Sequence, residues 1–261
     1  MRSSWYNCRL MTMLLLLLLL ALSSAGAAIE SAIKPPVCQL VYGIRMSRTG
    51  TVEKVLDAAR CQNADAAFIQ SFLEQVKPQV DGNVLELEIS DSHLPKMAGR
   101  NVFSNIGLRR LSIRRSGLET LALDIFDGQE NLLEELDLSD NRLEEIPAAI
   151  RNLTALSRLD VSRNRIRSLP QGVVFFHLLK LRHLNLNYNR LGYLDTIRYP
   201  TGVAAGQTLP LAIFNLEPLR EHIETLLIRS NNMSAFPDQF SRPFGRLRHL
   251  DLSSNNIQSN T

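Results

Sequence analysis

Apolar and polar positions alternate along most of the chain with a fixed spacing. Residues 133–147, LEELDLSDNRLEEIP, form one copy of an LxxLxLxxNxL pattern. Copies of this pattern start at Val84, Leu108, Leu133, Leu156, Leu181, Ile223 and Leu247. Five of the six intervals are 23 to 25 residues long. This period predicts a stack of similar units, each made of a short strand and a helical or irregular return segment.

Within each unit the apolar residues stand at pattern positions 1, 4, 6 and 11, which we expect to face inward. A single unit cannot bury them without a neighbour on each side. Position 9 is asparagine in five units, at Asn141, Asn164, Asn189, Asn231 and Asn255. An amide both donates and accepts hydrogen bonds, so this column is predicted to satisfy buried backbone groups where each strand ends. Ser92 and Ser116 replace it in the first two units.

The first 27 residues have the pattern of a secretory signal peptide. Arg2 and Arg9 precede an apolar run over residues 11–22, and the small residues 25–27 follow it. The run is shorter than the roughly 20 residues of a membrane-spanning helix. We therefore predict removal of residues 1–27 and a secreted or cell-surface protein, with a retained signal anchor as the alternative. Removal leaves 27 basic against 26 acidic residues (29 − 2 and 26 − 0), so charge does not indicate nucleic acid as a partner.

Two cysteines remain after this removal, Cys38 and Cys61. An even pair in a secreted chain predicts a disulfide, here within an N-terminal cap over residues 28–83. Two lone cysteines are too few for a structural zinc site, so no metal is expected. Residues 64–78 show apolar side chains at helical spacing, with Pro78 as the expected end of a cap helix.

On these motifs the chain resembles the extracellular leucine-rich repeat proteins, which include receptor ectodomains and matrix or adhesion proteins. The resemblance covers about residues 84–257. It implies an α/β solenoid of horseshoe form, with a parallel concave β-sheet and a disulfide-linked helical cap. The repeats would occupy residues 84–261, with an insertion at about 195–222 and an incomplete last unit. The clustered four-cysteine cap and the C-terminal cysteine cap of that group are absent from the sequence.

In that architecture the side chains at positions 3, 5, 7 and 8 form columns open to solvent. The charges at positions 3 and 8 alternate in sign from one unit to the next, for example Glu86, Arg110 and Glu135 at position 3. This alternation predicts ion pairs between neighbouring units. A second interpretation, compatible with the first, is a polar recognition strip for another protein.

Two further features are candidates for recognition. Position 10 is arginine in three consecutive units, at Arg142, Arg165 and Arg190, a basic stripe suited to carboxylate- or sulfate-bearing partners. Tyr188 is the aromatic residue of the position 8 column, and aromatic residues with arginine often dominate protein interfaces. Arg158 and Asp160, at positions 3 and 5 of the fourth unit, complete the candidate binding set. Solvated surface is the alternative for each of them.

No nucleophile motif, phosphate loop or paired catalytic groups stand out, so we expect neither an enzyme nor a cofactor. The sequence favours a protein-binding module with an extracellular protein ligand or receptor as partner, and a structural matrix component is the alternative. Asn152 and Asn232 are predicted N-glycosylation sites. The last unit stops after position 11 and no membrane span follows it, so we expect either part of a longer protein or a short secreted form that associates through its uncapped end.

Overall fold

The computed structural model describes residues 34–46, 52–80, 84–97, 102–104, 106–169, 173–192, 216–234 and 243–257. The chain divides into two compact units, Met1–Pro35 and Pro36–Thr261. Only residues 34 and 35 of the first unit are described. The predicted signal peptide, its cleavage point and the last four residues of the chain therefore lie outside the described residues. None of the helices in the described part of the chain has the length and hydropathy of a membrane span.

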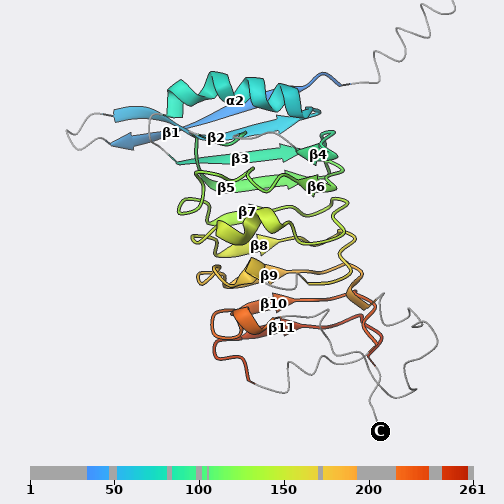
Figure 1. Ribbon diagram of the computed structural model, residues 1–261. Coiled ribbons are helices and arrows are strands. Elements are labelled where there is room, and N and C mark those ends of the chain that lie inside the picture. The colour runs from blue at the N-terminus through green and yellow to red at the C-terminus, as the bar shows by residue number, and fades with distance from the viewer. Residues whose placement is uncertain are drawn as a thin grey trace, which may run out of the picture. The chain divides into compact units, whose positions relative to one another are not determined.

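A nine-stranded sheet organises the second unit (Figure 1). Its strands, in spatial order, are β1 Val37–Met46, β2 Val52–Gln62, β3 Val84–Ser90, β5 Gly107–Arg114, β7 Glu135–Asp137, β8 Arg158–Asp160, β9 His183–Asn185, β10 Thr225–Leu227 and β11 His249–Asp251. Every neighbouring pair is parallel except β1 and β2. Parallel stacking of consecutive units confirms the predicted solenoid.

The return segments contain little regular structure. Short 3₁₀ helices are found at η1 Ala148–Asn152, η2 Val173–Phe175 and η4 Glu217–Leu219. A second, two-stranded parallel sheet joins β4 Lys96–Met97 to β6 Thr120–Leu121. The α-helix of the described residues is α2 Ala66–Val80, in the cap.

The predicted inward positions form one continuous core. In the third unit Leu133, Leu136, Leu138 and Leu143 are all 1% exposed or less, and the equivalent residues of the fourth unit are equally buried. The first unit departs from the pattern in one respect. Leu85 pairs with Leu108 and is fully buried, and the register then shifts by one residue before Glu86. Leu85 is thus equivalent in register to Leu108, which occupies inward position 1 of the second unit.

The asparagine column acts as predicted. Asn141 donates to the carbonyl of Ile113 in the preceding unit at 2.6 Å, and its side-chain oxygen accepts the backbone N–H groups of Ser116 and Leu118 at 3.1 Å. Ser116 itself donates from its hydroxyl to the carbonyl of Arg114, inside its own unit. A hydroxyl cannot bridge as many groups as an amide. Ser92 donates to the carbonyl of Ser90 and accepts the backbone N–H of Ala64 in the cap at 3.1 Å. The two serines thus make fewer bonds between units than Asn141 does, as expected from the sequence.

The cap contains more strand than the sequence indicated. β1 and β2 form an antiparallel hairpin, and Cys38 and Cys61 are register partners joined by the predicted disulfide. β2 also pairs in parallel with β3, so that Cys61 stands opposite Ile89 and is fully buried. The hairpin thus supplies a partial extra unit to the solenoid. Sequence periodicity missed it because only the last five residues of β2 pair with β3.

Helix α2 covers the cap, but its bounds differ from the predicted 64–78. Asp65 precedes the helix and accepts the backbone N–H of Phe68 at 2.7 Å, an N-cap interaction. Pro78 lies inside the last turn and does not end the helix, which continues to Val80. Proline has no N–H to donate to the carbonyl of Glu74, so the helix continues for two more residues without that hydrogen bond. Ile69, Leu73 and Val76 are the fully buried face.

The long interval between the fifth and sixth units leaves the sheet intact. β9 and β10 pair directly, with His183 opposite Thr225, so no additional strand is inserted between them. Most of the predicted insertion, residues 195–215, lies outside the described residues. On the described side, Gly192 lies against the backbone of Asn232, where an added Cβ would stand 2.0 Å from the carbonyl oxygen. Close contact between the fifth and sixth units is therefore retained.

Candidate functional site

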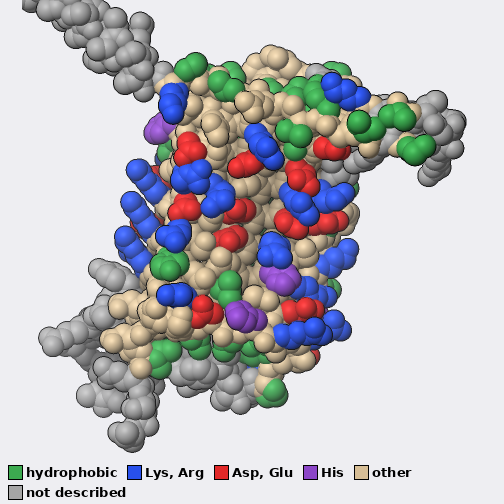
Figure 2. All heavy atoms as spheres, turned by 180° about the vertical axis from the view of Figure 1, so that it is seen from behind, with side chains coloured by type: hydrophobic (Ala, Val, Ile, Leu, Met, Phe, Trp, Pro, Cys, Tyr) green, Lys and Arg blue, Asp and Glu red, His purple; other side chains and the backbone are tan. Residues whose placement is uncertain are grey.

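The exposed face of the sheet carries the charged columns predicted from the sequence (Figure 2). Acidic and basic side chains alternate down this face, and the strands β2 to β8 line a shallow hollow of about 360 Å³. Arg158 and Asp160 are among the lining residues. Its walls contain both signs of charge, and the geometry therefore suits a polar macromolecular surface better than a buried small molecule.

The position 3 column is a chain of ion pairs across the first three units. Arg110 approaches Glu86 at 3.0 Å on one side and Glu135 at 3.3 Å on the other. All three side chains are between 35% and 48% exposed. The predicted pairing between units is confirmed here. Each such exposed pair contributes only a fraction of a kcal/mol, roughly 0.2–1.

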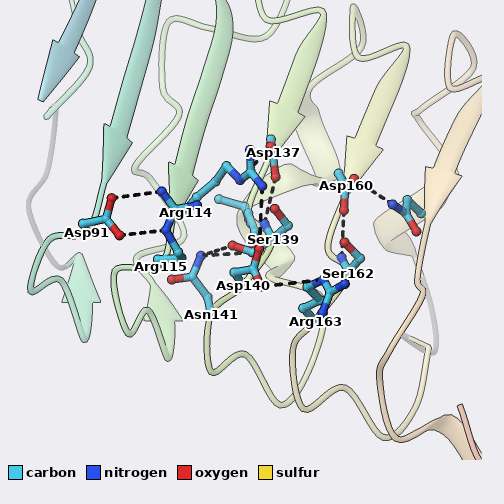
Figure 3. A network of polar contacts seen from close by, with 12 residues as sticks. Asp91, Arg114, Arg115, Asp137, Ser139, Asp140, Asn141, Asp160, Ser162 and Arg163 are labelled. Atoms are coloured by element: carbon cyan, nitrogen blue, oxygen red, sulfur yellow. Dashed lines mark hydrogen bonds and ion pairs between the residues drawn. The ribbon is translucent and has the colours of Figure 1, made fainter. Parts of the chain in front are cut away.

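The position 8 column repeats the arrangement at the edge where the strands end (Figure 3). Arg115 makes two parallel hydrogen bonds to the carboxylate of Asp91, at 2.7 and 2.9 Å. The hydrogen bond and the charge of Asp91 raise the pKa of Arg115 above its ordinary value, so it stays protonated throughout the accessible pH range. Arg163 lies 3.8 Å from Asp140 in the same column.

Every described residue at position 8 has a positive φ. The values lie between 48° and 57° for Asp91, Arg115, Asp140, Arg163, Tyr188, Ser230 and Ser254. Left-handed backbone costs a residue with a side chain about 1 kcal/mol or more. The turn that ends each strand therefore imposes this geometry whatever residue occupies the position. Side chains at position 8 consequently emerge in a similar direction from each unit, which leaves their chemistry free to vary.

Arg114, at position 7, was not singled out in the sequence, although it links two units. Its guanidinium lies 3.6 Å from Asp137 and 3.7 Å from Asp140 (Figure 3). The alternation of charge at positions 3 and 8 does not reveal this contact. With Arg110 and Arg115 it forms a row on β5 and its following turn in which every charged side chain is basic, between acidic rows on β3 and β7.

Position 5 side chains have a structural role that the sequence did not reveal. Asp160 accepts the backbone N–H of Ser162 at 2.9 Å, and Asp137 does the same for Ser139. The second oxygen of Asp160 accepts from the side-chain amide of Asn185 at 2.7 Å. The signal for this role is an Asp or Asn two residues before the turn, a known competitor for backbone hydrogen bonds. Asp160 therefore has both carboxylate oxygens engaged within the fold.

Arg158 differs from the other position 3 arginine. It is exposed, and no ion pair joins it to another described residue. Its neighbour His183 is half-buried, and burial, followed by the positive charge of Arg158, lowers the pKa of this histidine below its ordinary 6.5. His183 is therefore neutral at physiological pH. The sheet face around β8 and β9 offers a free cation beside an uncharged imidazole.

Tyr188 and the three arginines of position 10 lie beyond the strand ends, at the edge of the face and outside the residues that line the hollow. Tyr188 is 41% exposed, and the guanidinium of Arg163 lies 4.4 Å from its ring centroid. Arg142 is 3.9 Å from Glu119. Arg165 and Arg190 are exposed, and no ion pair joins either to a described residue. The six candidates therefore separate into a face pair and an edge group.

The predicted glycosylation sites are both accessible. Asn152 is exposed at the end of η1, on a return segment, and Asn232 is exposed at position 10 of the sixth unit. Across the described ranges there is no group of three or more His, Cys, Asp or Glu side chains that could hold a metal ion.

Comparison with known proteins adds family information. A leucine-rich repeat family model matches residues 106–166, and a second leucine-rich repeat model matches residues 246–261. The volume-regulated anion channel subunit LRRC8A of Homo sapiens is 31% identical over 158 residues, which are 60% of this chain and 16% of that protein. The subunit LRRC8E of Mus musculus is 40% identical over 86 residues, 33% of this chain and 11% of that protein. The chain thus matches about a sixth or less of these relatives.

Solved structures agree on the fold. The protein LIC12759 of Leptospira interrogans has a TM-score of 0.51 at 20% identity, covering 78% of this chain and 50% of that one. A chain of the Drosophila Toll–Spatzle complex has a TM-score of 0.51 at 19% identity, covering 71% and 25%. At such identities the likeness shows a shared stacked-repeat architecture and nothing about ligands.

Proposed function

Because the chain is built of leucine-rich repeats, we propose that it is a secreted or cell-surface module that binds another extracellular protein on the exposed face and edge of its sheet. The proposed binding strip runs over β8 and β9 and along the turns that follow β7, β8 and β9. It contains Arg158, Tyr188 and the position 10 arginines.

One observation carries this proposal: the two halves of the face differ in how their charges are satisfied. On β5 and its following turn, Arg110, Arg114 and Arg115 each lie within 4 Å of a carboxylate of a neighbouring unit. A charged partner would have to compete with these internal pairs. From β8 onward Arg158, on the sheet face, has no ion pair with another described residue, and Tyr188 is exposed at the edge of that face in the next unit. Arginine and tyrosine are the residue types that most often dominate binding energy.

The edge group extends this strip. Arg165 and Arg190 are exposed without an acidic partner in the described residues, and Arg163 is held against the ring of Tyr188. Guanidinium groups bind carboxylates and sulfates in a bidentate manner. A partner with an acidic segment would therefore place its apolar or aromatic side chains near Tyr188 and its anions along the edge.

The extracellular location rests on three features that point the same way. The N-terminal sequence has the pattern of a signal peptide, and the Cys38–Cys61 disulfide is of a kind that persists in oxidising compartments. Both glycosylation sequons present an exposed asparagine. The match to the anion-channel relatives covers 16% and 11% of their length, so we do not transfer channel activity to this chain. We also propose no enzymatic role, because the matching family models describe a repeat.

To test binding, the purified protein is made into a tagged tetramer and used to probe a panel of immobilised extracellular ectodomains. A ligand bound by the wild type should lose at least tenfold in affinity when Arg158→Glu and Tyr188→Ala are combined. Arg151→Glu, on the exposed return segment η1, is the matched control and should bind normally. Equal loss in the control, or no loss in the double variant, would reject this binding strip.

Location is tested separately by expression in a eukaryotic secretory cell. We expect the protein in the medium, with its N-terminus at Ala28 and a mass that falls on deglycosylation. Asn152→Gln and Asn232→Gln should each remove one glycan. Protein that stays in the cytosol with an intact N-terminus would overturn the extracellular assignment.

A further inference from the structure

Strand β1 is the outer edge of the nine-stranded sheet. In the described part of the chain it pairs only with β2, so one side of its ten-residue backbone has hydrogen-bonding groups without a strand partner. Its sequence, VCQLVYGIRM, contains a single charged residue, Arg45, and no proline. Exposed edge strands usually carry charges, prolines or coverings that prevent further pairing. β1 is instead suited to add another strand.

The end of the hairpin is also unusually apolar. Ile44 is 78% exposed, Met46 is 76% exposed, and Val52, the register partner of Met46 on β2, is 68% exposed. Apolar side chains gather over this projecting hairpin in Figure 2. Most of them belong to the core-facing side of the strand, because Tyr42 stands opposite the fully buried Leu56. The apolar face of the hairpin therefore continues past the part that the core covers.

We propose that β1 pairs in antiparallel fashion with β1 of a second copy of this chain, around a two-fold axis at Tyr42. In an antiparallel pair, directly opposed residues point to the same face. A two-fold axis at Tyr42 places Ile44 opposite Leu40 of the second copy, and Met46 opposite Cys38 of the second copy. The exposed apolar end of each strand thereby meets the half-buried apolar start of the other.

This register also sets the remaining partners. Gln39 of one copy is the partner of Arg45 of the other, and Val41 is the partner of Gly43. The one charged position of the strand is therefore paired with a neutral position. A shift by one residue would place the core-facing side chains of one copy on the solvent face of the other. Self-complementarity of this kind is what a two-fold interface requires.

The interface uses an edge that the proposed ligand strip does not touch, because β1 and β8 are separated by four strands in the sheet order. Two copies would then present two binding strips on one continuous sheet. A dimer would raise avidity for a clustered partner without any new ligand contact.

The first test is sedimentation of the purified mature protein between 1 and 100 µM. We expect a reversible dimer. The double variant Ile44→Lys with Met46→Lys should weaken the dimer by at least a hundredfold while its circular dichroism stays unchanged. A matched pair of lysines at the exposed positions Phe176 and Leu179, on a return segment, should leave the dimer intact. A wild type that is monomeric at 100 µM would overturn the proposal.

The register has its own test. Tyr42→Cys places two thiols across the two-fold axis and should give a disulfide-linked dimer in air, whereas Val41→Cys faces Gly43 of the second copy and should not. Peptide mapping must show the Cys38–Cys61 bond intact in both variants. Equal cross-linking of the two variants rejects this pairing. Co-sedimentation of a monomeric wild type with phosphatidylcholine and phosphatidylserine vesicles would instead identify the apolar hairpin as a lipid contact.

Discussion

Asn164 accepts the backbone N–H of Leu143 at 3.0 Å, so the side chain of one unit closes the turn of the unit before it. Its amide nitrogen donates to the carbonyl of Leu138 in that same preceding unit and to Val161 in its own. Asn164 is 7% exposed. The bonds between units therefore form away from water, where an unsatisfied backbone group is costly.

Replacing Asn164 with alanine should lower the free energy of unfolding by about 3 kcal/mol, because it leaves buried N–H and carbonyl groups of two units without partners. Urea denaturation followed by circular dichroism measures this loss. The control is Asn256→Ala, at an exposed position whose side chain makes no hydrogen bond to another described residue, which should change stability by about 0.5 kcal/mol or less. Similar losses in the two variants would show that the asparagine column is not the element that joins the units.

The repeat pattern predicted most of the fold because inward and outward positions follow one period. Leu136 and Leu159 occupy equivalent, fully buried places on adjacent strands, and the alternating charges at position 3 meet as expected. The disulfide was also predictable, since the expected removal of residues 1–27 leaves two cysteines and therefore one pairing. These features depend only on the spacing of residues along the sequence, and the stacked units keep that spacing.

Features outside the repeat template were not predictable. The β1–β2 hairpin has no period to reveal it, and Gln129 is a buried amide on a return segment that hydrogen-bonds to Phe103, Ile106 and Leu108. The candidate site was only partly foreseen. Asp160 has the features of a binding residue in sequence, yet its oxygens are used by Ser162 and Asn185. Which charges remain free depends on neighbours 20 to 25 residues away.

Gly192 provides a test of the contact between the fifth and sixth units. It donates its backbone N–H to the carbonyl of Asn231 at 2.9 Å, and a Cβ at Gly192 would meet the Asn232 carbonyl oxygen at 2.0 Å. The atoms that would clash belong to the backbone, which cannot move aside as a flexible side chain can. Gly192→Ala should therefore destabilise the protein by about 2 kcal/mol in thermal or urea unfolding.

The control for that substitution is Gly245→Ala. An added Cβ there stands 2.8 Å from the carboxylate end of Glu221, which can rotate away. We expect a change of about 0.5 kcal/mol or less. If the Gly192→Ala variant loses no more unfolding free energy than this control, the fifth and sixth units do not stack closely across the long interval.

His183 makes stability depend on pH in a defined direction. Its pKa is lowered in the folded protein, first by burial and then by Arg158, so the unfolded chain takes up a proton first as the pH falls. Above the ordinary pKa of 6.5 both states are neutral and His183 has no effect. Below 6.5 the free energy of unfolding should fall, and the loss should level off below the folded pKa. His183→Asn should remove this component from the pH profile.

The cause of the lowered His183 pKa can be tested in the Arg158→Ala variant, in which proton NMR follows the titration of the His183 ring. Removing the neighbouring positive charge should move the pKa of His183 upward, toward 6.5. Arg151→Ala, on η1, is the control and should leave it in place. A wild-type His183 that titrates at 6.5 or above would contradict both the burial and the charge effect.

The edge arginines should govern binding without supporting the fold. Replacing Arg142, Arg165 and Arg190 with glutamate changes the charge by six at exposed positions, so an acidic partner should be repelled and its affinity should fall at least a hundredfold. The melting temperature should stay within a few degrees of wild type, because only Arg142 has an ion partner among the described residues, at 3.9 Å.

The matched control carries the same charge change at Arg109, Arg151 and Lys180, which are exposed away from this edge. Surface plasmon resonance at two salt concentrations compares the two triple variants. If both triple variants bind as tightly as the wild type, binding depends on the sheet face alone. If both lose the same affinity, the effect comes from net charge and not from the edge arginines.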